Sequence, residues 1–216
     1  MKVRRTTAAL GISVAMLALA ACGNGDTDEG AETDTNGEAA EPQTGEDGDF
    51  VTDLTFGTGG TGGVYYPLGG EYSAIFEENI EGVSVTYTDS GASVENIGMI
   101  FQEEWQLGIA QSDTANAAVT GSADFEGAQV DNVGWIAALY PEAAHLVTLE
   151  GNGIETVADL EGARIAVGDI GSGTRAASDA ILAAYGIEEG DYEPFEQDFA
   201  SSLDLLRDGN IDASIF

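Results

Sequence analysis

The sequence is poor in positive charge. It has 216 residues with 6 Lys and Arg against 39 Asp and Glu, which gives a formal net charge of −33. Binding to nucleic acid or to an anionic membrane through a basic surface needs a positive face, so the composition excludes both. Hydrophobic residues make up 43% of the chain, which is enough for a packed core.

Cysteine and histidine are nearly absent as well. The single cysteine, Cys22, excludes an intramolecular disulfide and a multi-cysteine metal site. The single histidine, His145, leaves little room for a zinc centre or a histidine-dependent triad, and we expect it to be structural. No serine fits the G-x-S-x-G pattern, and no carboxylate pair stands out from the acidic background. We therefore predict no catalytic residue, no metal and no cofactor.

The first 21 residues have the features of an export signal. Three basic residues precede an apolar run over 6–21, which is shorter than the roughly 20 residues of a membrane-spanning helix. The run ends in Leu-Ala-Ala-Cys22, which resembles the lipobox of bacterial lipoproteins. We predict a signal peptide over 1–21, lipidation of Cys22 and an extracytoplasmic protein anchored to the outer face of the cytoplasmic membrane. The alternative is a buried helix with an incidental cysteine, and the Sec and twin-arginine routes both stay open.

Acidic residues dominate the rest of the chain in two different ways. Residues 23–49 hold ten acids and almost nothing apolar, so we predict an acidic disordered tether over 22–49. From Phe50 onward, 29 acids and three arginines are spread over 167 residues. Dispersed carboxylates without lysine are typical of a protein that works in high salt, and a merely acidic extracytoplasmic protein is the alternative.

Strand-like and helical runs alternate from Asp53 onward, which predicts an α/β protein with a mainly parallel sheet. The predicted strands are 53–58, 83–88, 107–111, 133–139, 145–149, 164–168, 192–195 and 211–216. The predicted helices are 64–79, 93–104, 113–120, 157–160, 174–185 and 201–207. We expect Trp105 and Trp135 to pack inside. Because the chain stops within an apolar strand, we also expect it to be a fragment.

Six segments resemble the TAXI family of solute-binding proteins, which serve tripartite ATP-independent periplasmic (TRAP) transporters. They are 56–69 (FGTGGTGGVYYPLG), 90–96 (SGASVEN), 107–113 (LGIAQSD), 139–146 (LYPEAAHL), 159–174 (DLEGARIAVGDIGSGT) and 205–216 (LLRDGNIDASIF). The likeness covers about residues 50–216, with acids where family members often carry lysine. Family members continue for roughly another hundred residues, as expected of a two-domain clamp.

The resemblance implies a type II periplasmic-binding-protein-like fold, with two lobes of mainly parallel sheet and flanking helices around a cleft. Lobe one would span 50–139, and lobe two would span 140–216 and be incomplete. The implied ligands are small organic anions such as glutamate or a dicarboxylate, and the implied partners are TRAP membrane subunits. We expect a monomer.

Four turns rich in glycine, serine or threonine each follow a predicted strand and open a predicted helix. They lie at 57–62, 90–93, 111–114 and 171–174. Helix N-termini that converge at the carboxyl ends of strands attract an anion without needing lysine. Each turn alone is also explained as an ordinary helix cap. The first turn matches G-x-G-x-x-G and Asp89 follows the next strand, but the export signal and the gap from Gly62 to Asp89 count against a dinucleotide site.

Side chains beside these turns complete the predicted site. Arg175 is the only base next to a turn and can hold a carboxylate at two points, although a surface arginine paired with an acid is equally expected. Tyr65 and Tyr140 offer a ring and a hydroxyl to a cleft, with core packing as the alternative. The predicted ligand-binding residues are Gly60, Thr61, Tyr65, Ser90, Ser93, Asn96, Gln111, Ser112, Tyr140, Ser172, Thr174 and Arg175.

Three functions are compatible with these observations. The first is a lipid-anchored, non-enzymatic receptor that captures a small organic anion for a TRAP-type importer. The second is an extracytoplasmic enzyme on the same α/β scaffold. The third is a surface lipoprotein without a small ligand. A shift in melting temperature with ligand, with or without turnover, separates the three.

Overall fold

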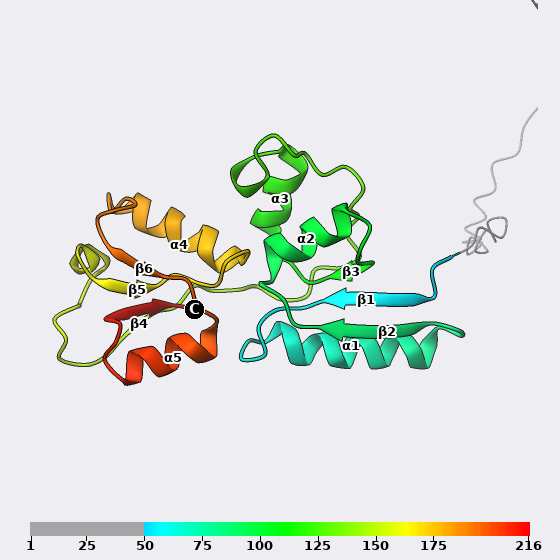
Figure 1. Cartoon of the computed structure of the whole chain (residues 1–216), viewed down its shortest axis with the longest axis horizontal. Coiled ribbons are helices and arrows are strands. Elements are labelled where there is room, and N and C mark those ends of the chain that lie inside the picture. The colour runs from blue at the N-terminus through cyan, green and yellow to red at the C-terminus, as the bar shows by residue number, and fades with distance from the viewer. Residues whose placement is uncertain (1–49) are drawn as a thin grey trace, which may run out of the picture. The chain divides into compact units, whose positions relative to one another are not determined.

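Strands and helices alternate along the chain, and the strands form two separate sheets (Figure 1). The computed structural model describes residues 50–216. The predicted signal peptide, the lipidation site at Cys22 and the predicted tether lie outside the described residues.

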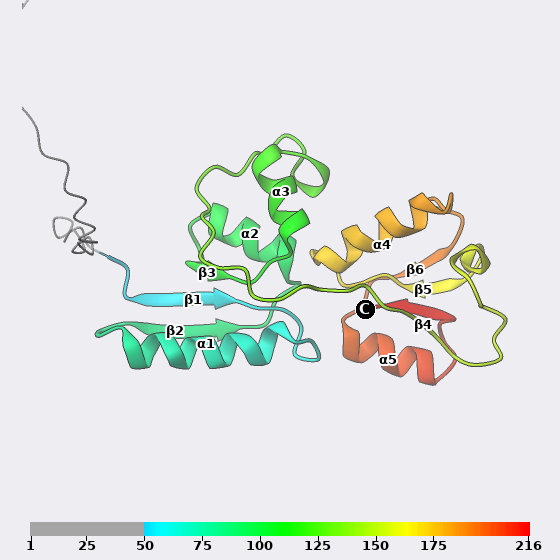
Figure 2. The same cartoon turned by 180° about the vertical axis from the view of Figure 1, so that it is seen from behind.

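The first sheet is entirely parallel and has the strand order β2-β1-β3. Its strands are β1 (Asp53–Gly57), β2 (Ser84–Thr88) and β3 (Leu107–Gly108). The connecting elements are α1 (Tyr65–Asn79), α2 (Ser93–Phe101), α3 (Ser112–Thr120) and the short η1 (Ala123–Phe125). Figures 1 and 2 show α1 on one side of this sheet and α2 and α3 on the other. The sheet therefore has helices on both faces, as a parallel sheet requires.

The second sheet is mixed and has the strand order β4-β7-β5-β6. Its strands are β4 (Leu146–Thr148), β5 (Arg164–Ala166), β6 (Glu193–Phe195) and β7 (Ala213–Ile215). The remaining elements are η2 (Val157–Leu160), α4 (Gly173–Ala184) and α5 (Phe199–Arg207). β5 runs parallel to β6 and β7, and only β4 is antiparallel to its neighbour. α4 and α5 lie on opposite sides of the sheet (Figure 1).

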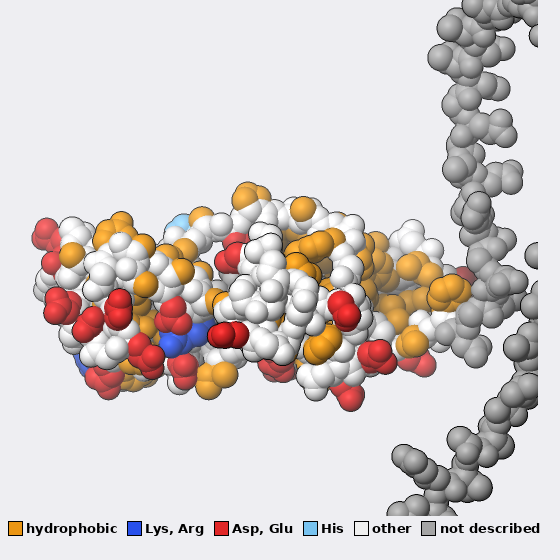
Figure 3. All heavy atoms as spheres, turned by 90° about the horizontal axis from the view of Figure 1, so that it is seen from above, with side chains coloured by type: hydrophobic (Ala, Val, Ile, Leu, Met, Phe, Trp, Pro, Cys, Tyr) orange, Lys and Arg blue, Asp and Glu red, His pale blue; other side chains and the backbone are white. Residues whose placement is uncertain are grey.

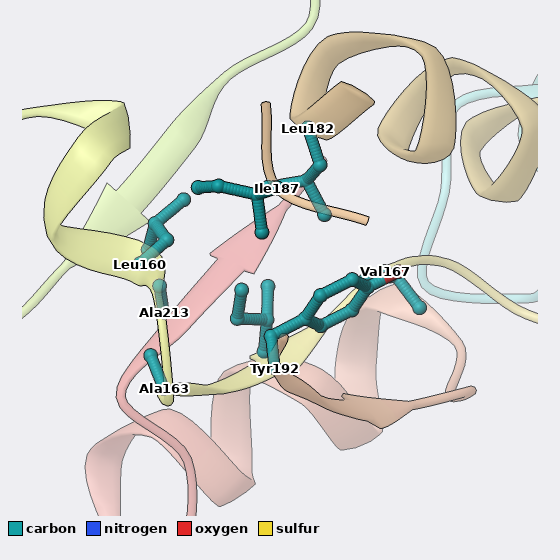
Figure 4. Close-up of a cluster of buried hydrophobic side chains, with 8 residues drawn as sticks. Leu160, Ala163, Val167, Leu182, Ile187, Tyr192 and Ala213 are labelled. Carbon is teal, nitrogen blue, oxygen red and sulfur yellow. The ribbon is translucent and has the colours of Figure 1, made fainter. Parts of the chain in front are cut away.

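Alternation along β5 builds a separate core on each face of the second sheet. Ile165 points into a cluster with Leu182 of α4, whereas Ala166 packs against Leu206 of α5. Figure 4 shows the first cluster, in which side chains from η2, α4 and β7 meet beside the sheet. Leu182 and Ile165 are almost completely buried. Each such side chain contributes about 1.5–3 kcal/mol of hydrophobic stabilisation, so this face fixes α4 firmly.

The predicted α/β class with mainly parallel sheet is confirmed, and one predicted strand is wrong. Residues 133–139 form no strand, and Trp135 and Ile136 have 65% and 78% of their surface exposed. The prediction that Trp135 packs inside is therefore also wrong. An uninterrupted apolar run indicates burial but supplies no pairing partner, and within residues 50–216 no strand pairs with this run. Trp105, in contrast, is half-buried, and its ring lies against Gly57.

Two other predicted boundaries move for visible reasons. The predicted helix 93–104 stops at Phe101, and Glu103 takes a positive φ of 63° that ends the helical path. The predicted strand 107–111 has only two paired residues, although Ile109 N–H still donates to Gly57 O at 3.1 Å. The chain after β3 thus leaves the sheet early and leads into the turn that opens α3.

Candidate functional site

All four predicted turns border one cavity of about 1520 Å³. Gly59 and Gly60 follow β1, Ser90 to Ser93 follow β2, and Gln111 and Ser112 follow β3. Ser172, Gly173 and Thr174, which follow β5, complete the polar boundary. Ligands of open α/β sheets bind beyond the carboxyl ends of parallel strands, and this cavity lies at those ends. It exceeds the roughly 300–1,000 Å³ of a usual ligand pocket, because it extends along an apolar region that includes Ile75 and Ile100.

The turn after β1 leaves the N-terminus of α1 open to the cavity. Gly63 N–H donates to Gly60 O at 2.9 Å and closes the turn. Val64 is the N-cap of α1, and no side chain caps this helix end. Pro67 has no N–H, and the N–H groups of Tyr65 and Tyr66 have no intrahelical partner, so these two are free to meet a ligand here. Thr61 is exposed and does not border the cavity, which removes it from the ligand contacts that we propose.

The glycines of this turn also have packing reasons. A Cβ on Gly62 would come within 2.9 Å of Ala200 Cβ, and one on Gly57 would collide with Trp105 and Asn96. Asp89, the predicted ribose-binding acid, does not border the cavity. Close approach of other side chains therefore accounts for two glycines of the G-x-G-x-x-G match, without a dinucleotide.

The turn after β2 is occupied by contacts within the protein. Asn96 is completely buried, and its Nδ2 donates to Thr58 O at 2.8 Å and to Ile109 O at 2.7 Å. Its Oδ1 accepts from Ser90 Oγ at 2.7 Å. Both amide hydrogens of Asn96 are thus used. Asn96 and Ser90 hold strand ends together, and we assign them a positioning role instead of the predicted ligand contact.

The N-terminus of α2 is closed by a carbonyl from the turn between β5 and α4. Val94 N–H and Glu95 N–H donate to Gly171 O at 2.9 and 3.2 Å. Ser93 Oγ accepts from Gln111 N–H at 3.0 Å, so this side chain joins two turns. The predicted ligand-binding N-terminus of α2 is therefore a structural junction.

The turns that open α3 and α4 meet face to face. A Cβ on Gly173 would collide with Gln111 Oε1 and come within 2.9 Å of Ser93 Oγ, so a larger residue at this position requires the Gln111 side chain to move. Gln111 Oε1 is buried and has no hydrogen-bond partner among the described residues. Ser112 is exposed at the cavity boundary. Ser172 Oγ caps α4 by accepting from Arg175 N–H at 3.0 Å, and Thr174 is half-buried beside it.

Arg175 does not border the cavity, contrary to the predicted clamp. Its guanidinium forms an ion pair with Asp179 one turn along α4, and its Nε lies 3.3 Å from Glu196 Oε1. Partial burial opposes the charge, but Asp179 and Glu196 outweigh burial and raise the pKa of Arg175. This arrangement fits the alternative of a surface arginine paired with acids, because acidic side chains lie within reach of Arg175 on two elements.

The other two arginines are also paired with acids. Arg164 forms a two-point ion pair with Asp212, with Nη2–Oδ1 at 2.6 Å and Nε–Oδ2 at 3.0 Å. Arg207 Nη1 lies 3.7 Å from Asp204 Oδ1. Figure 3 shows acidic side chains scattered over one face, with few basic ones between them. Within residues 50–216, no arginine borders the cavity, so helix N-termini supply the positive partial charges there, and Asp113, Asp169 and Asp198 also border it.

A carboxylate that the sequence analysis missed stands in the cavity boundary between the two predicted tyrosines. Tyr65 O–H donates to Glu142 Oε2 at 2.9 Å, and Tyr140 O–H donates to Glu142 Oε1 at 3.3 Å. Burial and the nearby Glu142 raise the pKa of Tyr65 well above its usual range, and they raise the pKa of Tyr140 to about 12. Both phenols therefore keep their protons at physiological pH. Sequence reasoning could not single out Glu142 among 29 dispersed acids, and its position two residues after Tyr140 was the one available signal.

Two further classes of site find no support in the described part of the chain. Among residues 50–216, no group of three or more histidine, cysteine, aspartate or glutamate side chains is arranged to hold a metal ion. No helix in the same range is both long and apolar enough to cross a membrane. His145 borders the cavity, and its backbone pairs with Phe216 through N–H···O bonds of 2.9 and 3.0 Å.

Solved structures place this fold among the periplasmic solute-binding proteins. The alkanesulfonate-binding protein SsuA from Xanthomonas axonopodis pv. citri, bound to MOPS, is 22% identical with a TM-score of 0.55. The match covers 76% of this chain and 54% of that one. An ABC uptake transporter substrate-binding protein from Streptococcus pneumoniae with bound histidine is 16% identical, with a TM-score of 0.52 and coverage of 76% and 65%. A putative L-cystine ABC transporter protein from Listeria monocytogenes is 14% identical, with a TM-score of 0.51 and coverage of 76% and 69%.

These likenesses establish the periplasmic-binding-protein-like fold, and this chain spans about half the length of the SsuA protein. A family model matches residues 56–216. The chain belongs to the NMT1-like family.

Proposed function

We propose that this chain is the extracytoplasmic solute-binding receptor of a TRAP-type secondary importer. It captures a small organic anion in the cavity and delivers it to membrane subunits, without catalysing a reaction. The observation that carries the proposal is the cavity at the carboxyl ends of the strands, bordered by four turns in a chain with a periplasmic-binding-protein-like fold. The resemblance of six segments to TAXI proteins favours the TRAP class of importer.

The proposed ligand contacts are those predicted residues that border the cavity and are not fully used in holding the turns. They are Gly60, Tyr65, Gln111, Ser112, Tyr140, Ser172 and Thr174. The N–H groups at the starts of α1, α3 and α4 supply donors for the anionic group of the ligand. We keep the division into lobes at residues 139 and 140 as part of this proposal. It falls in the irregular stretch between η1 and β4.

The proposal includes a lipid anchor at Cys22 and a monomeric receptor at the outer face of the cytoplasmic membrane. A single lipidated residue supplies the anchor, so Cys22→Ser should move the protein from the membrane fraction to the soluble fraction. Fractionation followed by immunoblotting measures this. Unchanged membrane association of the variant would contradict the anchor.

A receptor for an ABC importer is the second candidate. Two of the similar structures carry ABC transport in their descriptions, and one of them holds histidine. The two classes differ in the energy source of uptake. Cellular uptake of the labelled solute that stops when the ion gradient is collapsed, at unchanged ATP, supports the TRAP class. Uptake that follows ATP supports the ABC class.

A thermal-shift screen of the full chain against organic acids and amino acids tests the receptor itself. A binder present at 100 times its dissociation constant adds about 2.7 kcal/mol of stability, which is a readily measured rise in melting temperature. A shift without chemical change of the compound supports the receptor. Turnover of the compound would support an enzyme instead, and no shift across the panel would support a surface lipoprotein.

A further inference from the structure

The boundary of the cavity at Glu142 consists of hydrogen-bond acceptors. Tyr65 and Tyr140 each have one hydroxyl hydrogen, and both hydrogens point to the Glu142 carboxylate, at 2.9 and 3.3 Å. A tyrosine that donates its only hydrogen keeps lone pairs alone for a further partner, and a carboxylate accepts but does not donate. This part of the boundary therefore offers a ligand acceptors and negative charge.

The helix N-termini that border the same cavity have the opposite character, although Asp113, Asp169 and Asp198 also border it. The N–H groups of Tyr65 and Tyr66 in α1 and of Gly173 and Thr174 in α4 are free donors, and they lie at the positive ends of the helix dipoles. No arginine among residues 50–216 borders the cavity to neutralise Glu142. A ligand that meets both regions must bring an anionic group for the turns and a donor with positive charge for Glu142.

We infer that Glu142 selects ligands that carry an ammonium group beside their anionic group, so that the receptor takes amino acid zwitterions in preference to dicarboxylates. This inference rests on the proposed receptor function and narrows its ligand class. The Tyr65 and Tyr140 hydroxyls fix the Glu142 carboxylate in place. A dicarboxylate would set a second negative charge against Glu142, and like charges at short distance repel each other even though Glu142 is exposed.

Matched pairs of amino acid and 2-oxo acid test the inference. The pairs are L-glutamate with 2-oxoglutarate, L-alanine with pyruvate, and L-leucine with 2-oxoisocaproate. The members of a pair share a carbon skeleton and a carboxylate and differ in the ammonium group. Calorimetric titration of the full chain measures the affinity for each compound. We expect the amino acid of at least one pair to bind about 10-fold or more tightly than its oxo acid, as for a charge-assisted contact.

Glu142→Gln is the decisive variant, because it keeps the shape of the side chain and removes its charge. It should weaken the bound amino acid by about 10-fold or more and should leave the oxo acid unchanged or bound more tightly. Glu150→Gln is the matched control. Glu150 is exposed and does not border the cavity, and its replacement removes one charge from the same part of the chain. We expect affinities within about 2-fold of the original chain for this control.

Three results would overturn the inference. Equal binding of both members of each pair would remove selection by charge and leave the receptor function standing. Equal weakening of amino acid and oxo acid by Glu142→Gln would make Glu142 a positioning residue only. Binding of none of the six compounds would overturn the inference together with the proposed capture of small organic acids.

Discussion

The N-termini of α1 and α2 border the same cavity, but the first N–H groups of α1 are free, whereas those of α2 are bonded within the protein. No side chain caps α1, and its glycine turn leaves the first N–H groups open. α2 also lacks a side-chain cap, but Gly171 O accepts from Val94 N–H and Glu95 N–H at 2.9 and 3.2 Å. Both turns look alike in sequence, because each places small residues between a strand and a helix. The comparison teaches that such a turn can bind an anion only where no carbonyl from elsewhere in the protein arrives first.

The strongest way to break the closed arrangement at α2 is to remove Asn96. Asn96→Ala leaves Thr58 O and Ile109 O without their donor in a buried place, so it should cost about 2–4 kcal/mol of unfolding free energy. Urea denaturation measures the loss. Asn116→Ala is the control, since Asn116 is exposed on α3, and it should change stability by less than about 0.5 kcal/mol. Equal stability of both variants would show that Asn96 does not hold the turns.

A second variant separates the turns that meet between the two sheets. Gly173→Ala places a methyl group against Gln111 Oε1 and Ser93 Oγ, and overpacking of this kind should cost about 1–3 kcal/mol. Gly98→Ala is the control, because a Cβ at this position in α2 meets nothing within 4 Å, and it should be neutral or slightly stabilising. Thermal unfolding measures both variants.

The double variant Gly173→Ala with Gln111→Ala sharpens this test. Removal of the Gln111 amide makes room for the new methyl group, so part of the lost stability should return. A double variant no more stable than the Gly173→Ala single variant would show that the contact with Gln111 is not the cause.

A smaller effect is expected where a helix N-terminus is capped and also borders the cavity. Ser172→Ala removes the acceptor of Arg175 N–H and should cost about 1 kcal/mol of stability. If α4 binds the anionic group of the ligand, the same variant should also weaken binding several-fold. Thr61→Val, outside the cavity, should leave affinity unchanged. Comparable losses of affinity in both variants would argue against the arrangement of contacts that we propose.

The smallest effect is expected from the residue that the sequence made most prominent. Arg175→Ala removes ion pairs with Asp179 and Glu196 at the surface, which should cost about 1 kcal/mol or less. Ligand affinity should change by less than about 3-fold, because Arg175 does not border the cavity. Calorimetry of the variant checks this, and a loss of affinity of 100-fold would restore the predicted clamp.

Much of the fold follows from local sequence patterns. The alternation of strand-like and helical runs located β1, β2, β4 and both long helices α1 and α4 within one or two residues. The same reasoning failed for residues 133–139, which form no strand, because pairing with another strand depends on the whole fold and not on the run itself. The proposed adaptation to high salt stays a prediction.

The candidate site was predictable in its backbone and less so in its side chains. The ends of strands and starts of helices can be read from the sequence, and their turns border one cavity. Only the three-dimensional structure shows that Glu142 borders the cavity and that Arg175 does not. Asp179 stands four residues after Arg175 and was visible as a partner, but Glu196 comes from the segment after β6. One of the two tyrosines that bind Glu142, Tyr65, is 77 residues away in sequence.

The bonds from Val94 and Glu95 to Gly171 also make it possible to follow the relative motion of the two segments that they join. They join the segment before α4 to the start of α2, so every separation of these two regions exposes two amide hydrogens to water. The rate at which those hydrogens exchange with deuterium therefore measures how often the two regions separate. A solute that bridges the open ends of α1 and α4 should slow the exchange of these amide hydrogens, and a solute that binds elsewhere should leave the exchange rate unchanged.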